Sequence, residues 1–131
     1  LKPRITENGI DYILVGDMLE HVSEPEKVLK NIGKYLKKGG YVITEAVNVR
    51  HYSAVITLLK QGVFPHKKKY AQTELQKLLM ENGYKTEKVN AVEIGKPDER
   101  EQIFVEMLSA FTDVSSKDFL AYKYVIKAAK S

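Results

Sequence analysis

The fold is decided by a short apolar stretch near the N-terminus, residues 10–16, which read IDYILVG. The run is rich in β-branched and aromatic residues, Asp11 is its single charge, and Gly16 ends it. A strand that is buried on both faces of a parallel sheet has this pattern, because neither face meets water. The stretch therefore predicts a buried parallel strand and an α/β fold.

The next thirty residues predict a helix and a second strand. Ser23 and Glu26 have the spacing of a capping box, and Pro25 stands in the first turn, where proline is tolerated. Apolar residues then recur at helical spacing, and Gly39 is expected as the C-cap. Residues 41–46 form another apolar run, so the segment predicts a right-handed βαβ unit.

Five further elements are expected in the rest of the chain. They are a helix at residues 52–60, a helix opened by a capping box of Thr73 and Gln76, a strand at 84–94, a helix begun by Asp98 and Glu101, and a strand at 119–128. A loop at 63–70 separates the first two. The order β-α-β-α-α-β-α-β predicts one α/β layer domain over residues 1–131.

Composition excludes several classes of protein. The chain has 131 residues and no cysteine, so disulfides and thiolate metal sites are excluded and a cytoplasmic location is expected. No apolar run approaches the ~18 residues of a membrane span, so no membrane contact is expected. The net charge of +4 is mild and the lysines are scattered, which disfavours nucleic acid as a partner. The basic run at 66–69 is too short to change that interpretation.

Three stretches, taken in order, carry a family resemblance. Residues 10–22 hold the first strand and its loop, residues 36–43 read LKKGGYVI, and residues 82–127 run from Asn-Gly-Tyr through a strand and a helix to the terminal strand. Together they resemble the class I S-adenosylmethionine-dependent methyltransferases. The resemblance covers nearly all of the chain after Asn8, and Lys38 stands where proline is common in that family.

The resemblance implies half of a Rossmann-like methyltransferase sheet. The family's fourth, fifth, seventh and sixth strands would lie side by side, the last two antiparallel, with helices on both faces. The family's first three strands are absent, and with them the glycine-rich cofactor loop; Gly39-Gly40 precedes a strand and does not supply that loop. Because the chain begins at Leu1, we expect a truncated domain whose N-terminal half lies upstream in a longer protein.

Two candidate sites follow from this topology. In an open α/β sheet the ligand lies beyond the carboxyl ends of the strands, where the strand order reverses. The resemblance implies that the loop after the first strand lines the cofactor S-adenosylmethionine through Gly16, Asp17, Met18, Leu19 and His21. Asn48, Arg50 and His51 follow the second strand and are candidates for binding substrate, with Arg50 suited to an anionic group.

For both candidate sites a purely structural interpretation stays open. The first loop would then only cap the next helix, and the second would be a solvated loop. Histidine is a residue type that suits general acid-base work, so that role stays open for His21. The spacing of Asp17, Glu20 and His21 is poor for a metal, and no metal site is expected.

The functional hypothesis is a fragment of an enzyme. With its missing half present, the chain would take part in methyl transfer from S-adenosylmethionine to an unidentified acceptor. That reaction needs mainly positioning, so no catalytic residue is predicted. Alone, the chain is expected to be inactive and not to bind the cofactor. The alternative is a non-catalytic methyltransferase-like binding or dimerisation module.

Strand 10–15 is expected to form an exposed edge. Without the family's first strand, its N–H and C=O groups lack a partner, and such edges recruit other chains. Ile13 and Val15, or their neighbours, should then be partly bare. A homodimer through residues 10–15 is predicted, unless residues 1–6 fold back over the edge.

Overall fold

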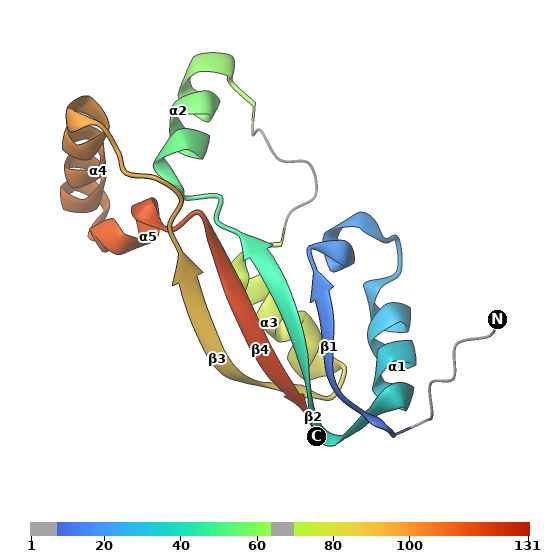
Figure 1. The fold of residues 1–131 in the computed structure, drawn as a ribbon. Helices are drawn as coiled ribbons and strands as arrows, with labels where there is room; N and C mark the ends of the chain where they lie inside the picture. The colour runs from blue at the N-terminus through green and yellow to red at the C-terminus, as the bar shows by residue number, and fades with distance from the viewer. Residues whose placement is uncertain (1–7, 64–69) are drawn as a thin grey trace.

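A four-stranded sheet organises the protein (Figure 1). The computed structural model describes residues 8–63 and 70–131. The strands are β1 (Ile10–Gly16), β2 (Leu36–Val47), β3 (Tyr84–Val92) and β4 (Lys123–Lys130). Their order is β1-β2-β4-β3, with β1 parallel to β2, and β4 antiparallel to both β2 and β3. The predicted strand order and the antiparallel closing pair are confirmed.

The helices divide between one face and one end of the sheet. They are η1 (Met18–His21), α1 (Pro25–Tyr35), α2 (Tyr52–Gln61), α3 (Gln72–Glu81), α4 (Glu99–Thr112) and α5 (Ser116–Leu120). Leu29 of α1 and Leu75 and Leu79 of α3 pack with the sheet in the main core. Helices α2, α4 and α5 gather instead at one end, around a small second core (Figure 1). The expected arrangement of helices on both faces is therefore replaced by one covered face and one helical end.

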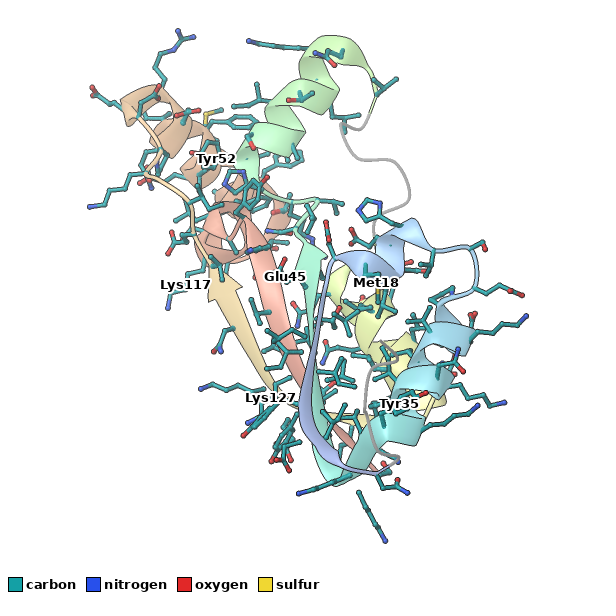
Figure 2. All side chains as sticks on the ribbon, turned by 45° about the vertical axis from the view of Figure 1, so that its right-hand side comes forward. Met18, Tyr35, Glu45, Tyr52, Lys117 and Lys127 are labelled. Carbon is teal, nitrogen blue, oxygen red and sulfur yellow. The ribbon has the colours of Figure 1, made fainter. Side chains whose placement is uncertain are left out.

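Side chains of the sheet alternate between the covered face and an open face. Val42, Thr44 and Ala46 of β2 are buried beneath the helices. The intervening positions face the other way, and we call that surface the open face: Tyr12, Leu14, Tyr41, Ile43, Glu45 and Lys127. Glu45 and Lys127 are labelled in Figure 2.

Next to β1, the open face is apolar and partly exposed to solvent. Tyr12 is 58% exposed and Leu14 77%, whereas Val15 is buried on the covered face. The Tyr12 and Tyr41 rings stack with centroids 5.5 Å apart, and the Lys127 ammonium lies 3.9 Å from the Tyr41 centroid. The predicted exposure of side chains on this strand is thus confirmed for Tyr12 and Leu14, the neighbours of Ile13 and Val15.

The LKKGG segment is a bulge in β2 and not a helix end. Helix α1 ends at Tyr35 and β2 begins at Leu36, so the prediction that Gly39 caps the helix is wrong. The parallel pairing sets residues 37–40 against the single Asp11 of β1. Leu36 is fully buried and pairs with Ile10 of β1. The chain therefore joins the sheet at Leu36, before Gly39 and Gly40.

Two predicted capping boxes are wrong. Helix α1 has Glu24 at its N-cap, without a capping side-chain bond, and Ser23 lies outside it. Pro25 sets this start, since proline favours the first helical position. Helix α3 begins at Gln72, so Thr73 is already inside the helix.

Two N-caps shape the C-terminal third of the chain. The Asp98 carboxylate accepts from the Glu101 N–H at 2.8 Å, and the Glu101 carboxylate accepts from the Asp98 N–H at 2.9 Å. This capping box confirms the helix start that was predicted at these residues. Ser115 caps α5. Because α5 contains Phe119, the predicted strand at 119–128 is wrong at its start; β4 runs from 123 to 130. The expected loop at 63–70 and the basic run at 66–69 lie largely outside the described residues, as does the segment 1–6.

Candidate functional site at the carboxyl ends of the parallel strands

The chain leaves β1 through a glycine that a neighbouring threonine holds in place. Gly16 has φ +58°, in the left-handed region where glycine is unstrained. The ladder between β1 and β2 shifts register between Leu14 and Gly16. The buried Thr44 hydroxyl donates to the Gly16 carbonyl at 2.8 Å. Thr44 thereby sets the direction in which the following loop leaves the sheet.

This loop presents some of the predicted cofactor residues and buries another. Asp17, Met18 and His21 are exposed, and Met18 is labelled in Figure 2. The His21 Nε2 lies 3.4 Å from the Asp17 carboxylate, a long contact between two solvated groups. Leu19 is 1% exposed and packs in the main core, so it anchors the loop. Contact of these residues with a cofactor stays a prediction.

The loop fits one wall of a cofactor site. A Cβ on Gly16 would meet nothing within 4 Å, so the space in front of the strand end is open. Asp17 offers a carboxylate to hydroxyl or amino groups, and Met18 offers a soft apolar surface to an aromatic ring. Within residues 8–63 and 70–131, no glycine-rich strand-loop-helix faces this wall from the other side.

Asn48 joins the end of β2 to α5. Its amide Nδ2 donates to the Asp118 carbonyl at 2.5 Å and to the Ala121 carbonyl at 2.7 Å. Its Oδ1 accepts from the Arg50 N–H at 3.0 Å. The side chain is buried and its hydrogen-bonding groups are occupied, so Asn48 positions its neighbours.

His51 caps α2 from a buried position. Its Nδ1 accepts from the Ser53 N–H at 3.2 Å, so the neutral ring carries its proton on Nε2, which has no partner in the described structure. The ring packs against Tyr52 at 4.3 Å and edge-on to Tyr122 at 5.5 Å. Burial lowers the pKa of His51, and the nearby Glu101 carboxylate partly opposes the shift.

A hollow of about 160 Å³ lies beside Asn48 and Arg50. The ends of β2 and α5 and the starts of α3 and β4 surround it. Tyr124 donates from its hydroxyl to the Asp118 carboxylate at 3.2 Å inside this lining. Burial raises the pKa of Tyr124, the Asp118 carboxylate adds to the shift, and Arg50 opposes it. The phenol is therefore protonated at neutral pH.

The sequence did not indicate Asp118 and Tyr124 as site residues. Tyr124 has the alternation of ordinary strand packing, and Asp118 lies in a helix that no sequence signal marked. Only the return of β4 beside β2 brings them next to Arg50. A larger hollow of about 480 Å³ lies between α3 and the start of β3, away from the carboxyl ends of the parallel strands β1 and β2.

Two classes of site find no support in the described part of the chain. Among residues 8–63 and 70–131, no helix is both long and apolar enough to cross a membrane. The same residues contain no group of three or more histidine, aspartate or glutamate side chains that could hold a metal ion.

Comparison with known proteins identifies the family. Residues 4–89 match the profile of the methyltransferase domain, which is more than half of the chain. The chain belongs to the methyltransferase domain family. No curated protein gives a significant sequence match to this methyltransferase domain.

Solved structures share the fold of this methyltransferase domain. A S-adenosylmethionine-dependent methyltransferase from Archaeoglobus fulgidus has a TM-score of 0.62 at 17% identity, over 96% of this chain and 62% of that protein. A possible histamine N-methyltransferase from Thermotoga maritima has a TM-score of 0.60 at 20% identity, over 99% and 60%. Magnesium protoporphyrin IX methyltransferase from Synechocystis, solved with bound S-adenosylhomocysteine, has a TM-score of 0.56 at 14% identity, over 95% and 46%. The methyltransferase domain thus spans about three-fifths of the length of the first two proteins.

Proposed function

We propose that this chain is the C-terminal part of an S-adenosylmethionine-dependent methyltransferase, completed by a segment that precedes it. The family match and the shared fold support this assignment. About two-fifths of the length of the first two solved relatives lies outside the part that this chain matches, which leaves room for the missing cofactor wall.

The observation that carries the proposal is the open edge and face at β1. Among the described residues β1 pairs with β2 alone, so its outer N–H and C=O groups meet no strand. The side chains of Tyr12 and Leu14 are exposed to solvent beside that edge. Exposed apolar patches next to an unpaired strand mark a surface built to be covered. A preceding strand and helices would cover both.

The chain's own residues would contribute positioning to the reaction. When bound, S-adenosylmethionine supplies an already activated methyl group. The loop held by Thr44 would place Asp17 and Met18 against it, and the end of β2 would hold the acceptor. Such alignment is a large part of what an enzyme adds to a group transfer.

Calorimetry with S-adenosylmethionine tests the assignment. The 131-residue chain alone should show no saturable binding, because only one wall of the site is present. Co-expression with the segment encoded immediately upstream of Leu1 should restore binding and copurification. Micromolar binding by the chain alone would contradict the proposal, and so would a lack of binding in the co-expressed pair.

A matched pair of variants locates the contact. Leu14→Lys should abolish association with the upstream segment, since it puts a charge on the open face. Leu59→Lys changes an equally exposed leucine on α2 and should leave association intact; Leu59 is 69% exposed. Equal effects of the two variants would count against the open face as the contact.

The same edge favours one other function, a dimerisation module. Two copies of β1 paired antiparallel would satisfy both free edges without any upstream segment. In that case the co-expressed upstream segment would neither copurify nor restore cofactor binding, while the chain itself would sediment as a dimer.

A further inference from the structure

The hollow at the end of β2 holds two opposite charges that do not neutralise each other. Arg50 and Asp118 both line it. Both act electrostatically on the Tyr124 phenol, so both lie near the same point. Within the described residues, no ion pair joins the guanidinium of Arg50 to the carboxylate of Asp118. A gap with a positive and a negative side remains between them.

Asn48 holds the backbones of the two charged residues. Its Oδ1 accepts from the backbone N–H of Arg50, and its Nδ2 donates to the backbone carbonyl of Asp118. One buried amide therefore anchors both sides of the hollow.

Tyr124 orients the negative side. Its hydroxyl donates to one oxygen of the Asp118 carboxylate, and a carboxylate can accept several hydrogen bonds. The other oxygen is left to accept from a ligand. Arg50 offers a planar fork of donors that matches a carboxylate ligand.

We propose that this hollow binds a zwitterion, the ammonium and carboxylate of an α-amino acid, as the polar end of the methyl acceptor. The ligand carboxylate pairs with Arg50 and its ammonium with Asp118. The volume of about 160 Å³ accommodates such a head group. This inference rests on the proposed function in taking the hollow as the acceptor side of the site.

Nuclear magnetic resonance titration of the 131-residue chain with glycine tests the proposal. Glycine should cause saturable shifts at the amides of Asn48, Arg50 and Asp118. Acetate and methylammonium, which carry one charge each, should bind at least about tenfold more weakly, because each loses one charge-assisted contact. No saturable shift with glycine would overturn the proposal.

Variants separate the site from the surface at large. Arg50→Gln and Asp118→Asn should each weaken glycine binding about tenfold, with unfolding curves close to that of the parent chain. Arg100→Gln and Asp113→Asn, which change α4 and its end outside this hollow, should leave binding unchanged. Equal losses in all four variants would show unspecific attraction and overturn the site.

A competition measurement distinguishes an acceptor site from a cofactor site, because S-adenosylmethionine also carries an amino-acid end. In the co-expressed pair, S-adenosylhomocysteine should leave the glycine shifts in place. Displacement of glycine would show that the hollow holds the cofactor and would overturn the acceptor assignment. Restored cofactor binding without any glycine site would refute this inference alone. A glycine site without restored cofactor binding would refute the proposed function, and with it the acceptor role, but not the zwitterion site itself.

Discussion

At the scale of single residues, burial decides what the polar side chains after β2 can do. Asn48 and His51 were expected to face a substrate, yet both are buried in the joint between β2, α2 and α5. Arg50, between them, is exposed and borders the hollow. Three residues with one predicted role therefore have different surroundings, because the chain turns directly after β2 and directs their side chains differently.

His51 should make stability depend on pH. Burial lowers the pKa of the folded state below the ordinary value of 6.5, so the unfolded chain binds the proton more readily. The stabilising effect of neutral His51 is thus fully present above about pH 6.5 and is lost as the pH falls from there toward the folded-state pKa. Urea unfolding of His51→Asn should show a smaller decrease between about pH 7 and about pH 5, since asparagine also caps a helix but does not titrate. An unchanged pH dependence would contradict this account.

Thr44 should stabilise the start of the loop that follows β1. Thr44→Val removes the hydroxyl and leaves the Gly16 carbonyl without that donor, at a cost of about 1–3 kcal/mol in the free energy of unfolding. Amide hydrogen exchange should accelerate from Gly16 to Met18. Thr44→Ser keeps the hydroxyl and should restore slow exchange there, even if it loses some packing. Fast exchange in both variants would assign the effect to packing.

At the scale of elements, the two adjacent glycines of β2 are needed for different reasons. Gly39 has φ +83°, which side chains disfavour, but a Cβ there would meet nothing within 4 Å. At Gly40 a Cβ would lie 2.9 Å from the Lys37 carbonyl oxygen and 3.2 Å from that of Asp11. The bulge therefore combines a backbone requirement at one position with a space requirement at the next.

Alanine substitutions separate these two requirements. Gly39→Ala should cost about 1 kcal/mol of stability through backbone strain alone. Gly40→Ala should cost more, about 1–3 kcal/mol, because the backbones of β1 and β2 must move apart. Thermal unfolding of both variants checks the order, and exchange at the β1 amides should rise only for Gly40→Ala. The reverse order would show that the bulge tolerates a wider spacing.

At the scale of the whole molecule, the described part of the sheet has one face covered by helices, and its two edge strands are β1 and β3. The Lys127 ammonium and the Glu45–Lys123 ion pair at 3.0 Å give the open face some charge, but it lies mainly toward β4. The part next to β1 stays apolar at Tyr12 and Leu14. Association, whether with an upstream segment or with a second copy, is expected on that side.

Without an upstream segment, the chain should self-associate through β1. Sedimentation of the isolated chain at tens of micromolar concentration should show a dimer that dissociates on dilution. Leu14→Lys should shift it to monomer, and Leu59→Lys should not. A strict monomer whose residues 10–15 exchange rapidly would show that the edge is tolerated unpaired.

The sequence by itself determined the parallel strand at residues 10–16, most of the elements that follow it, and the family resemblance that implied the order of the strands. The elements follow from local patterns, namely apolar runs bounded by glycine and helical spacing, and the strand order follows from the resemblance. Where the helix before the LKKGG segment ends, and which side chains after β2 are buried, were decided only by the tertiary structure. Pairing with β1 places Leu36 in the sheet, and the pairing of β4 with β2 brings Asp118 and Tyr124 beside Arg50. Contacts between residues so distant along the chain leave no periodic trace in the sequence, so the hollow could be found only in the folded molecule.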